Sequence, residues 1–244
     1  QAAIPYLPKL ELNLLKEARG IADYVMERAY QEDKVSWIIP YNSAKDTWSL
    51  IPIKEDLYNG TSGLYLLFYY LYQETGEEKY NQFSNKLLYE CYVGILNNKQ
   101  FGLSGFPGFF YAFSLIEDYG SNKLKINKLI NEYCKLFENI LEEGINENLE
   151  IDYVNGITGL INALLRFYRK RRDEKFIRLA INFTNELEKR IENISAESGY
   201  AHGALGYALT FFRMSEMTSV KRYMDRAKKL LASDNHNFGK ICES

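Results

Sequence analysis

Histidine and cysteine are scarce in this chain, which has two histidines and three cysteines among 244 residues. The cysteines, Cys91, Cys134 and Cys242, are odd in number and include no Cys-x-x-Cys pair. This pattern argues against a disulfide framework and against a self-contained zinc finger. Any imidazole chemistry in the chain depends on His202 or His236.

The sequence also lacks a strong charge of either sign and a long apolar run. Its formal net charge is -2, which gives no basic field for nucleic-acid phosphates, and we expect no nucleic-acid partner. The longest apolar stretch, residues 63–72, is about half the length of roughly 20 residues that a membrane-spanning helix needs. Residues 1–11 contain no secretion signal. We therefore expect a cytoplasmic protein without a membrane span.

The main regularity is a Gly-x-x-Gly motif that occurs four times, each time before an apolar run typical of a buried helix. The copies are Gly60-Thr61-Ser62-Gly63, Gly105-Phe106-Pro107-Gly108, Gly156-Ile157-Thr158-Gly159 and Gly203-Ala204-Leu205-Gly206. Successive first glycines are 45, 51 and 47 residues apart, a period typical of stacked helical hairpins. The 20 tyrosines and 14 phenylalanines suit the wide interfaces of such helices.

Segments between these copies have apolar residues at intervals of three and four positions, which predicts amphipathic outer helices. These segments are residues 77–96, 123–143, 173–193 and 219–232. A further helix is predicted over residues 10–30, with one apolar face toward the first buried helix. That face comprises Leu14, Leu15, Ala18, Ile21, Ala22 and Val25. No segment favours a β-sheet, so the sequence predicts an all-α fold of inner and outer helices.

The glycine pairs have a predicted consequence for the ends of the inner helices. Glycine allows a sharp turn and a close approach of neighbouring elements. If inner and outer helices alternate, all four turns fall at one end of the assembly, and we expect helix N-terminal amides to be exposed around one mouth. Such amides stabilise an anion. For Gly60, Gly63, Gly105 and Gly108, packing alone is the simpler explanation.

His202 and Asp152 are the candidate catalytic residues, because each comes shortly before one of the last two glycine pairs. The repeat therefore predicts an imidazole and a carboxylate at equivalent ends of two inner helices. An isolated histidine is usually structural or solvated, and an aspartate before a helix is often only a cap, so both explanations stay open. His236, in Asp234-Asn235-His236-Asn237, is predicted to lie in a surface loop.

Three groups of residues resemble the cyclase domain of class II (LanM-type) lanthipeptide synthetases. They are Trp37-Ile38 with Trp48 to Pro52 and Asp56 to Gly63, then Ile151 to Gly159, and finally Gly199-Tyr200-Ala201-His202-Gly203-Ala204-Leu205-Gly206. The last group is the most specific match. The resemblance implies an α/α toroid with an inner and an outer ring of helices, of which this chain holds about four of roughly seven hairpins.

The same resemblance implies a zinc-dependent lanthionine cyclase. Such an enzyme adds cysteine thiols of a precursor peptide to dehydroalanine or dehydrobutyrine, which forms thioether rings. By this likeness His202 protonates the enolate carbon or hydrogen-bonds the enolate oxygen. Asp152 would orient the imidazole or help to remove the thiol proton, and the sequence leaves both roles open. No substrate-binding residue is indicated.

The sequence departs from the family at the zinc site. The family's ligands are a cysteine in a Trp-Cys-x-Gly motif and a later Cys-His pair, and neither motif occurs here. Cys242 lies in about the right region but without the tryptophan and the glycine of that motif, so we assign no metal ligand to this chain. We expect the zinc ligands downstream of Ser244, together with the remaining hairpins.

On this interpretation residues 1–244 are the N-terminal part of a cyclase domain within a longer synthetase. Residues 1–9, with Pro5 and Pro8, would form the linker from a preceding dehydratase domain. The expected partners are the precursor peptide and that dehydratase domain. Because the zinc-binding part is missing, we expect this stretch alone to be inactive.

Two other functions fit parts of the sequence. A non-catalytic helical repeat that binds a peptide or a partner protein would need no metal site. A glycoside-processing α/α toroid would need paired carboxylates, for which Asp56 and Asp152 are the candidates. Against the second function, no further acid lies beside the His202 motif, and both tryptophans, Trp37 and Trp48, come early in the chain.

Overall fold

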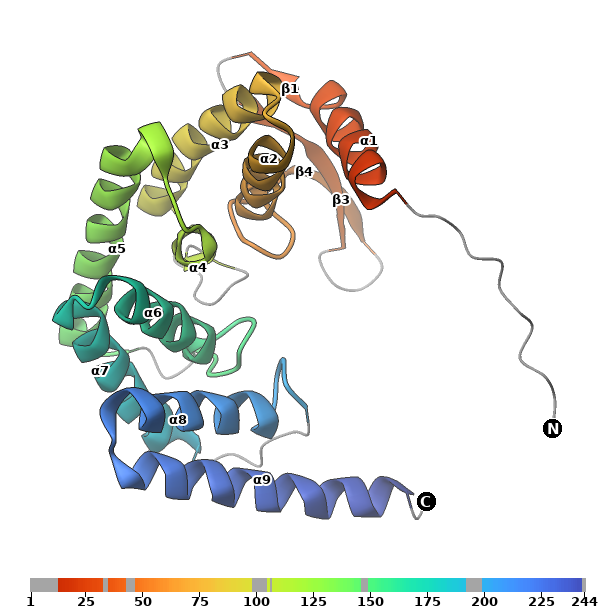
Figure 1. The fold of residues 1–244 in the computed structure, drawn as a ribbon. Coiled ribbons are helices and arrows are strands. Elements are labelled where there is room, and N and C mark those ends of the chain that lie inside the picture. The colour runs from red at the N-terminus through yellow and green to blue at the C-terminus, as the bar shows by residue number, and fades with distance from the viewer. Residues whose placement is uncertain are drawn as a thin grey trace. The chain divides into compact units, whose positions relative to one another are not determined.

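The computed structural model describes residues 13–32, 35–42, 47–97, 105, 107–145, 149–191 and 199–242. For residues 90–97 and 233–242 only the backbone is described. Most of the described chain is helical, as predicted (Figure 1). None of the described helices combines the length and the apolar character needed to cross a membrane. The chain divides into two compact units, Gln1–Ile53 with Leu64–Leu87 and Lys54–Gly63 with Leu88–Ser244.

The first unit contains short strands as well as helices. Its elements are α1 (Leu14–Glu27), β1 (Tyr30–Gln31), β2 (Val35–Ser36), β3 (Ile38–Asn42), β4 (Trp48–Pro52) and parts of α2 (Thr61–Thr75) and α3 (Glu78–Asn97). β1 pairs antiparallel with β2, and β3 with β4, so the expectation that no segment forms a sheet is wrong. β-Branched and aromatic side chains favour these strands. Pro40 and Pro52 are tolerated because both strands of a two-stranded sheet are edge strands.

α1 is shorter than the helix predicted over residues 10–30, and its apolar face is mostly exposed. The side chain of Asn13 caps its N-terminus. Of the six residues predicted to face a buried helix, only Ala22 is buried in the described structure, whereas Leu14 is 72% exposed and Ile21 is also exposed. The expectation of a buried face is therefore wrong. Periodicity identifies a helix, but it does not supply a partner for the apolar side.

Aromatic rings form the core of the first unit. The ring centroid of Phe68 on α2 lies 4.7 Å from that of Phe83 and 6.3 Å from that of Tyr80, both on α3. Trp37 contacts Phe83 edge-on, and its Nε1–H donates a hydrogen bond to the Val25 C=O at 2.8 Å. These contacts join α1 and the strands to the α2–α3 hairpin.

The second unit is built mainly of helical hairpins in two layers (Figure 1). The helices that follow glycine pairs form one layer, α4 (Pro107–Leu115), α6 (Ile157–Arg171) and α8 (Ala204–Thr218). The other layer consists of α5 (Lys123–Glu143), α7 (Glu174–Ile191) and α9 (Lys221–Cys242), and the 3₁₀ helix η1 (Gly120–Asn122) precedes α5. α6 contacts both α4 and α8, and α5 contacts α7. The predicted alternation of two helix types is confirmed in this unit.

Helix bounds in this unit agree with the sequence pattern except at the last helix. α5 spans residues 123–143 as predicted, whereas α9 continues to Cys242. His236 therefore lies in a helix, and its assignment to a surface loop is wrong. Asp and Asn have low helix propensity, but each costs only a few tenths of a kcal/mol. No proline interrupts residues 221–242, so the helix can continue through them.

Phe110 on α4 is the centre of the aromatic contacts between the two layers. Its ring centroid lies 4.6 Å from that of Phe167 on α6, and 5.6 and 5.1 Å from those of Tyr133 and Phe137 on α5. All four side chains are buried. Tilted and edge-to-face ring pairs add to the stabilisation from apolar burial, and this cluster therefore fixes α6 against its neighbours.

Replacing Phe110 with alanine should lower the free energy of unfolding by about 3–5 kcal/mol, because a fully buried ring is lost and a cavity remains. Urea denaturation measures this change. Leu124→Ala is the control, since Leu124 on α5 is 86% exposed and its truncation should change stability by less than about 0.5 kcal/mol. Equal losses in the two variants would contradict the assigned core.

Candidate functional site

The turn before α6 holds Asp152 in a fixed position. Asp152 Oδ1 accepts a hydrogen bond from the Asn155 N–H at 2.5 Å, and the residue is buried. A Cβ at Gly156 would overlap the backbone of Glu150 and of Asp152. Because only glycine fits at that position, the local sequence itself determines where the carboxylate lies.

The turn of residues 199–203, before α8, depends on glycine in the same way. A Cβ at Gly206 would overlap the carbonyl oxygen of Tyr200, so this turn lies against the start of α8 only because residue 206 has no side chain. The Leu205 N–H donates to the Gly199 C=O at 3.1 Å. His202 is thereby fixed at the end of α8 that corresponds to the Asp152 end of α6.

The two turns bring the candidate residues into contact. His202 Nδ1 lies 2.7 Å from Asp152 Oδ2, and the Tyr153 N–H donates to the Ala201 C=O at 3.0 Å. An ionised carboxylate only accepts hydrogen bonds, so Nδ1 carries the proton in this pair. The His202 side chain is 53% exposed, while the carboxylate beneath it is nearly buried. The arrangement is a half-exposed imidazole oriented by a buried acid.

A buried polar network joins α6 to α8 further along both helices than this pair. Asn162 Nδ2 donates to Thr210 Oγ1 at 2.6 Å and to the Thr158 C=O at 2.8 Å, and Arg213 Nη1 donates to Asn162 Oδ1 at 2.5 Å. These bonds satisfy both ends of a buried amide. They fix the register of α6 against α8 and hence the spacing of the two turns. The sequence analysis did not identify them.

Three backbone amides at the starts of these helices are used by their own turns and are not open to a ligand as was expected. The Ile157 and Thr158 N–H groups donate to the Glu150 and Ile151 C=O groups at 3.2 and 3.3 Å. The Leu205 N–H is used by its own turn as well. The preceding residues fold back and satisfy these three donors, which a helix start would otherwise leave unpaired. Side chains would therefore share in stabilising a developing anion at this end.

Asp56 lies in a turn that repeats the Asp152 turn closely. Asp56 Oδ1 accepts the Asn59 N–H at 2.6 Å, and a Cβ at Gly60 would overlap the backbone as one at Gly156 would. Burial raises the pKa of Asp56, against the opposing effect of backbone N–H bonds from Asn59 and Tyr58. This bond within the turn accounts for an aspartate at this point of the repeat. Contact with His202 is what distinguishes Asp152.

Tyr153 interacts with Tyr200 and with Tyr111, and the sequence analysis assigned no role to any of the three. Tyr153, next to Asp152, is buried, and its ring centroid lies 4.7 Å from that of Tyr200. Burial, followed by hydrogen bonding to Tyr200 and Tyr111, raises the pKa of Tyr153. Two of them could have been identified by their closeness in the sequence to the candidate residues, since Tyr153 and Tyr200 each lie within two residues of one.

No metal site is found in the described part of the chain, where no group of three or more His, Cys, Asp or Glu side chains could hold an ion. Cys134 on α5 is buried, and burial raises the pKa of its thiol to about 12. A thiol of that kind stays protonated near neutral pH and is a poor ligand. The side chains of Cys91, His236 and Cys242 lie outside the described residues.

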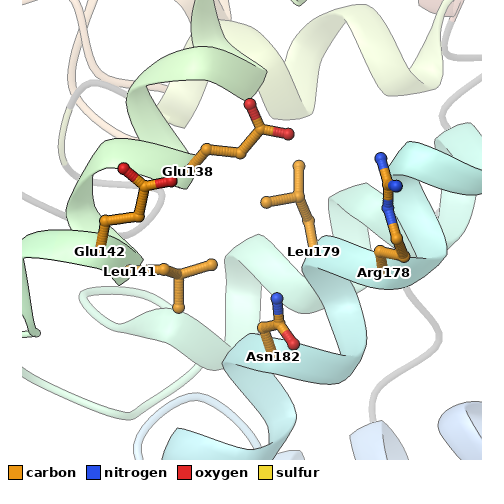
Figure 2. Close-up of a pocket in the computed structure, with 6 residues that line it drawn as sticks. All are labelled: Glu138, Leu141, Glu142, Arg178, Leu179 and Asn182. Carbon is orange, nitrogen blue, oxygen red and sulfur yellow. The ribbon is translucent and has the colours of Figure 1, made fainter.

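A pocket on the other helix layer is separate from the candidate residues. It has a volume of about 300 Å³ and lies between α5 and α7 (Figure 2). Its lining residues are Glu138, Leu141, Glu142, Arg178, Leu179 and Asn182. Figure 2 shows the two glutamates on one side and Arg178 on the other. Neither Asp152 nor His202 contributes to it.

Comparison with protein-family models matches residues 51–242 to the family described as lanthionine synthetase C-like protein. This match covers most of the chain, including both turns. The chain belongs to the lanthionine synthetase C-like family. A comparison with curated proteins returns no significant match.

The fold of this LanC-like chain is similar to that of a solved structure, nisin cyclase. The TM-score is 0.55 and the sequence identity 16%, and the matched region covers 75% of this chain and 58% of nisin cyclase. The chain thus has a partial LanC-like fold that spans less than two thirds of nisin cyclase. The predicted relationship to LanC-like cyclases is confirmed at the level of family and fold.

Asp56→Asn should stabilise this LanC-like protein at about pH 8 and much less at about pH 3.5, below the ordinary pKa of an aspartate. Because burial raises the pKa of Asp56, ionisation of its carboxyl opposes folding. This cost is fully present above the folded-state pKa and is gone once the pH falls below the ordinary pKa of aspartate in the unfolded chain. Asparagine keeps an oxygen for the Asn59 N–H. Urea denaturation at both pH values measures the effect, and a change in stability that is independent of pH would contradict it.

Proposed function

We propose that this chain is part of a lanthionine cyclase. The enzyme would add cysteine thiols of a precursor peptide to dehydroalanine or dehydrobutyrine within the same peptide, forming thioether rings. Family membership and the nisin cyclase-like fold support the reaction class. The observation that carries the proposal is the 2.7 Å contact between His202 Nδ1 and Asp152 Oδ2.

The proposal extends to the class II synthetase context suggested by the sequence motifs. In that context a dehydratase domain would precede residue 1 in the same polypeptide, with residues 1–9 as linker. The described hairpins would form about four of roughly seven in an α/α toroid. The partial coverage of nisin cyclase agrees with this arrangement.

His202 would act on the intermediate of the addition. When the sulfur bonds to the β-carbon, the π electrons of the double bond move to form an enolate, and a proton must then reach the α-carbon. A protonated imidazole at the half-exposed His202 side chain can donate that proton from Nε2. The amides of Ile157, Thr158 and Leu205 are already used by their turns, so the side chain is the better source of stabilisation for the enolate.

Asp152 would orient the imidazole, and a direct role in removing the thiol proton has less support. One of its oxygens accepts the Asn155 N–H and the other contacts His202 Nδ1. The carboxylate is also nearly buried beneath the ring. An acid in that position stabilises the imidazolium and fixes which nitrogen faces the substrate.

Zinc remains an expectation from the family and is not assigned to the described residues. When bound, zinc would supply a thiolate from a substrate cysteine. The described side chains do not fit such a site, since no suitable cluster occurs among them and the Cys134 thiol is buried. The proposed roles of His202 and Asp152 concern the proton transfer that follows bond formation.

A peptide-binding module without catalysis is the second candidate. The lack of a metal cluster in the described part favours it. A glycoside-processing enzyme has less support, because the proposed acid pair, Asp56 and Asp152, is buried and one of the two contacts an imidazole. Catalytic carboxylates in such enzymes flank an open cleft.

His202→Ala should lower the rate of cyclisation by roughly 10²- to 10⁴-fold, the usual contribution of a general acid. The full-length polypeptide is mixed with dehydrated precursor peptide, and the remaining free thiols are counted by alkylation and mass spectrometry. Circular dichroism and the thermal midpoint serve as controls for folding, which the half-exposed side chain should hardly affect. Unchanged cyclisation by a folded variant would refute the catalytic role and favour the binding module.

Asp152→Asn should also slow cyclisation, because an amide would turn its NH₂ toward Nδ1 and favour the other tautomer of His202. Asp56→Asn is the matched control, since Asp56 has the same turn geometry and the same backbone partner type. Its cyclisation rate should equal that of the wild type. Equal slowing in both variants would indicate a role of the turns in folding, and not in orienting an imidazole.

A further inference from the structure

Tyrosines from three segments of the second unit meet at Tyr153, the residue that directly follows Asp152. Tyr111 belongs to α4, Tyr153 to the turn before α6, and Tyr200 to the turn before α8. The rings of Tyr153 and Tyr200 are tilted by 39°, with centroids 4.7 Å apart. After burial, the neighbouring phenols of Tyr200 and Tyr111 also raise the pKa of Tyr153. The Tyr200 ring thus packs against the buried ring of Tyr153.

This ring contact connects the same two turns that carry the acid and the imidazole. Tyr153 directly follows Asp152, and Tyr200 lies two residues before His202. The Tyr153 N–H also donates to the Ala201 C=O at 3.0 Å. A backbone bond, a ring pair and the side-chain contact at Nδ1 therefore join the turns at three neighbouring points.

Exposure separates a positioning role for Tyr200 from a role in stability. Tyr200 is 44% exposed, so truncation of its side chain leaves little cavity, in contrast to the buried Tyr153. The Tyr200 carbonyl lies directly against Gly206, and this contact fixes the backbone of the turn on the α8 side. The Tyr200 ring holds the turn on its other side, against Tyr153. Functional side chains need to be held within about 0.5 Å of their working geometry.

We propose that Tyr200 is a positioning residue, whose ring on Tyr153 holds the His202 turn at the distance that lets Nδ1 contact Asp152. The effect of Tyr200 on the position of His202 follows from the contact between the Tyr153 and Tyr200 rings. Its effect on catalysis rests on the proposed function. The ring supplies the contact.

The test compares Tyr200→Leu, which removes the ring, with Tyr200→Phe, which keeps it. NMR of the full-length protein with ¹⁵N-labelled histidine follows the Nδ1–H signal of His202, which is assigned by its loss in His202→Ala. Tyr200→Leu should broaden this signal or speed its exchange with solvent at least about tenfold, because the Nδ1–H hydrogen bond opens more often. Tyr200→Phe should restore slow exchange.

Tyr70→Leu is the matched control, because Tyr70 on α2 has the same exposure of 44% and a ring neighbour, Tyr69, at 5.2 Å. It should leave the His202 signal unchanged. In the cyclisation assay Tyr200→Leu should lower kcat by about 10- to 100-fold with little change in KM, since misplacement of a catalytic group by about 1 Å has effects of this size. Tyr200→Phe should restore kcat.

An unchanged Nδ1–H signal of His202 in Tyr200→Leu would overturn the inference. It would also be overturned if Tyr200→Phe weakened this signal as much as Tyr200→Leu does. A changed signal without a change in kcat would support the positioning of His202 and refute its catalytic role. The NMR readout therefore separates failure of this inference from failure of the proposed cyclase function.

Discussion

Close backbone contact at Gly156 and Gly206 is the constraint on which the candidate site depends. At each position a Cβ would overlap the backbone of the preceding turn, so glycine alone lets that turn fold back against the start of its helix. The folded-back residues then satisfy the amides of Ile157 and Thr158 at the start of α6 and that of Leu205 in the first turn of α8. The same geometry brings Asp152 and His202 to equivalent helix ends, where the lateral contact of α6 with α8 makes them neighbours.

This constraint changes the electrostatic character of the helix ends. A helix start usually offers unpaired N–H groups to an anion, and the glycine pairs suggested several such starts around one mouth. In the structure three of those donors, on Ile157, Thr158 and Leu205, are used by the turns, which leaves a larger role at this end for a side chain that can move a proton. A single half-exposed imidazole above a buried acid suits that role.

Much of the second unit could be predicted from sequence because its signals are local. The period of the glycine pairs identified the hairpins, and the spacing of apolar residues gave the bounds of α5. Predictions failed where the outcome depends on a partner. The apolar face of α1 is largely exposed, β3 and β4 pair where no strand was expected, and the donors at the helix starts are used by turns. The tyrosine contacts also depend on neighbouring hairpins, which periodicity along one helix cannot reveal.

Asp56 and Asp152 show why the repeat by itself does not make a functional site. Both carboxylates accept an N–H from an asparagine three residues later, and both turns require glycine. Each aspartate is thus explained within its own hairpin by a hydrogen bond that closes the turn. Function requires something from outside that hairpin, and for Asp152 this is an imidazole and a tyrosine ring from the next turn. The candidate site therefore belongs to the junction between two hairpins, so its geometry depends on every interaction that fixes their spacing, from the Asn162 network to the aromatic core around Phe110.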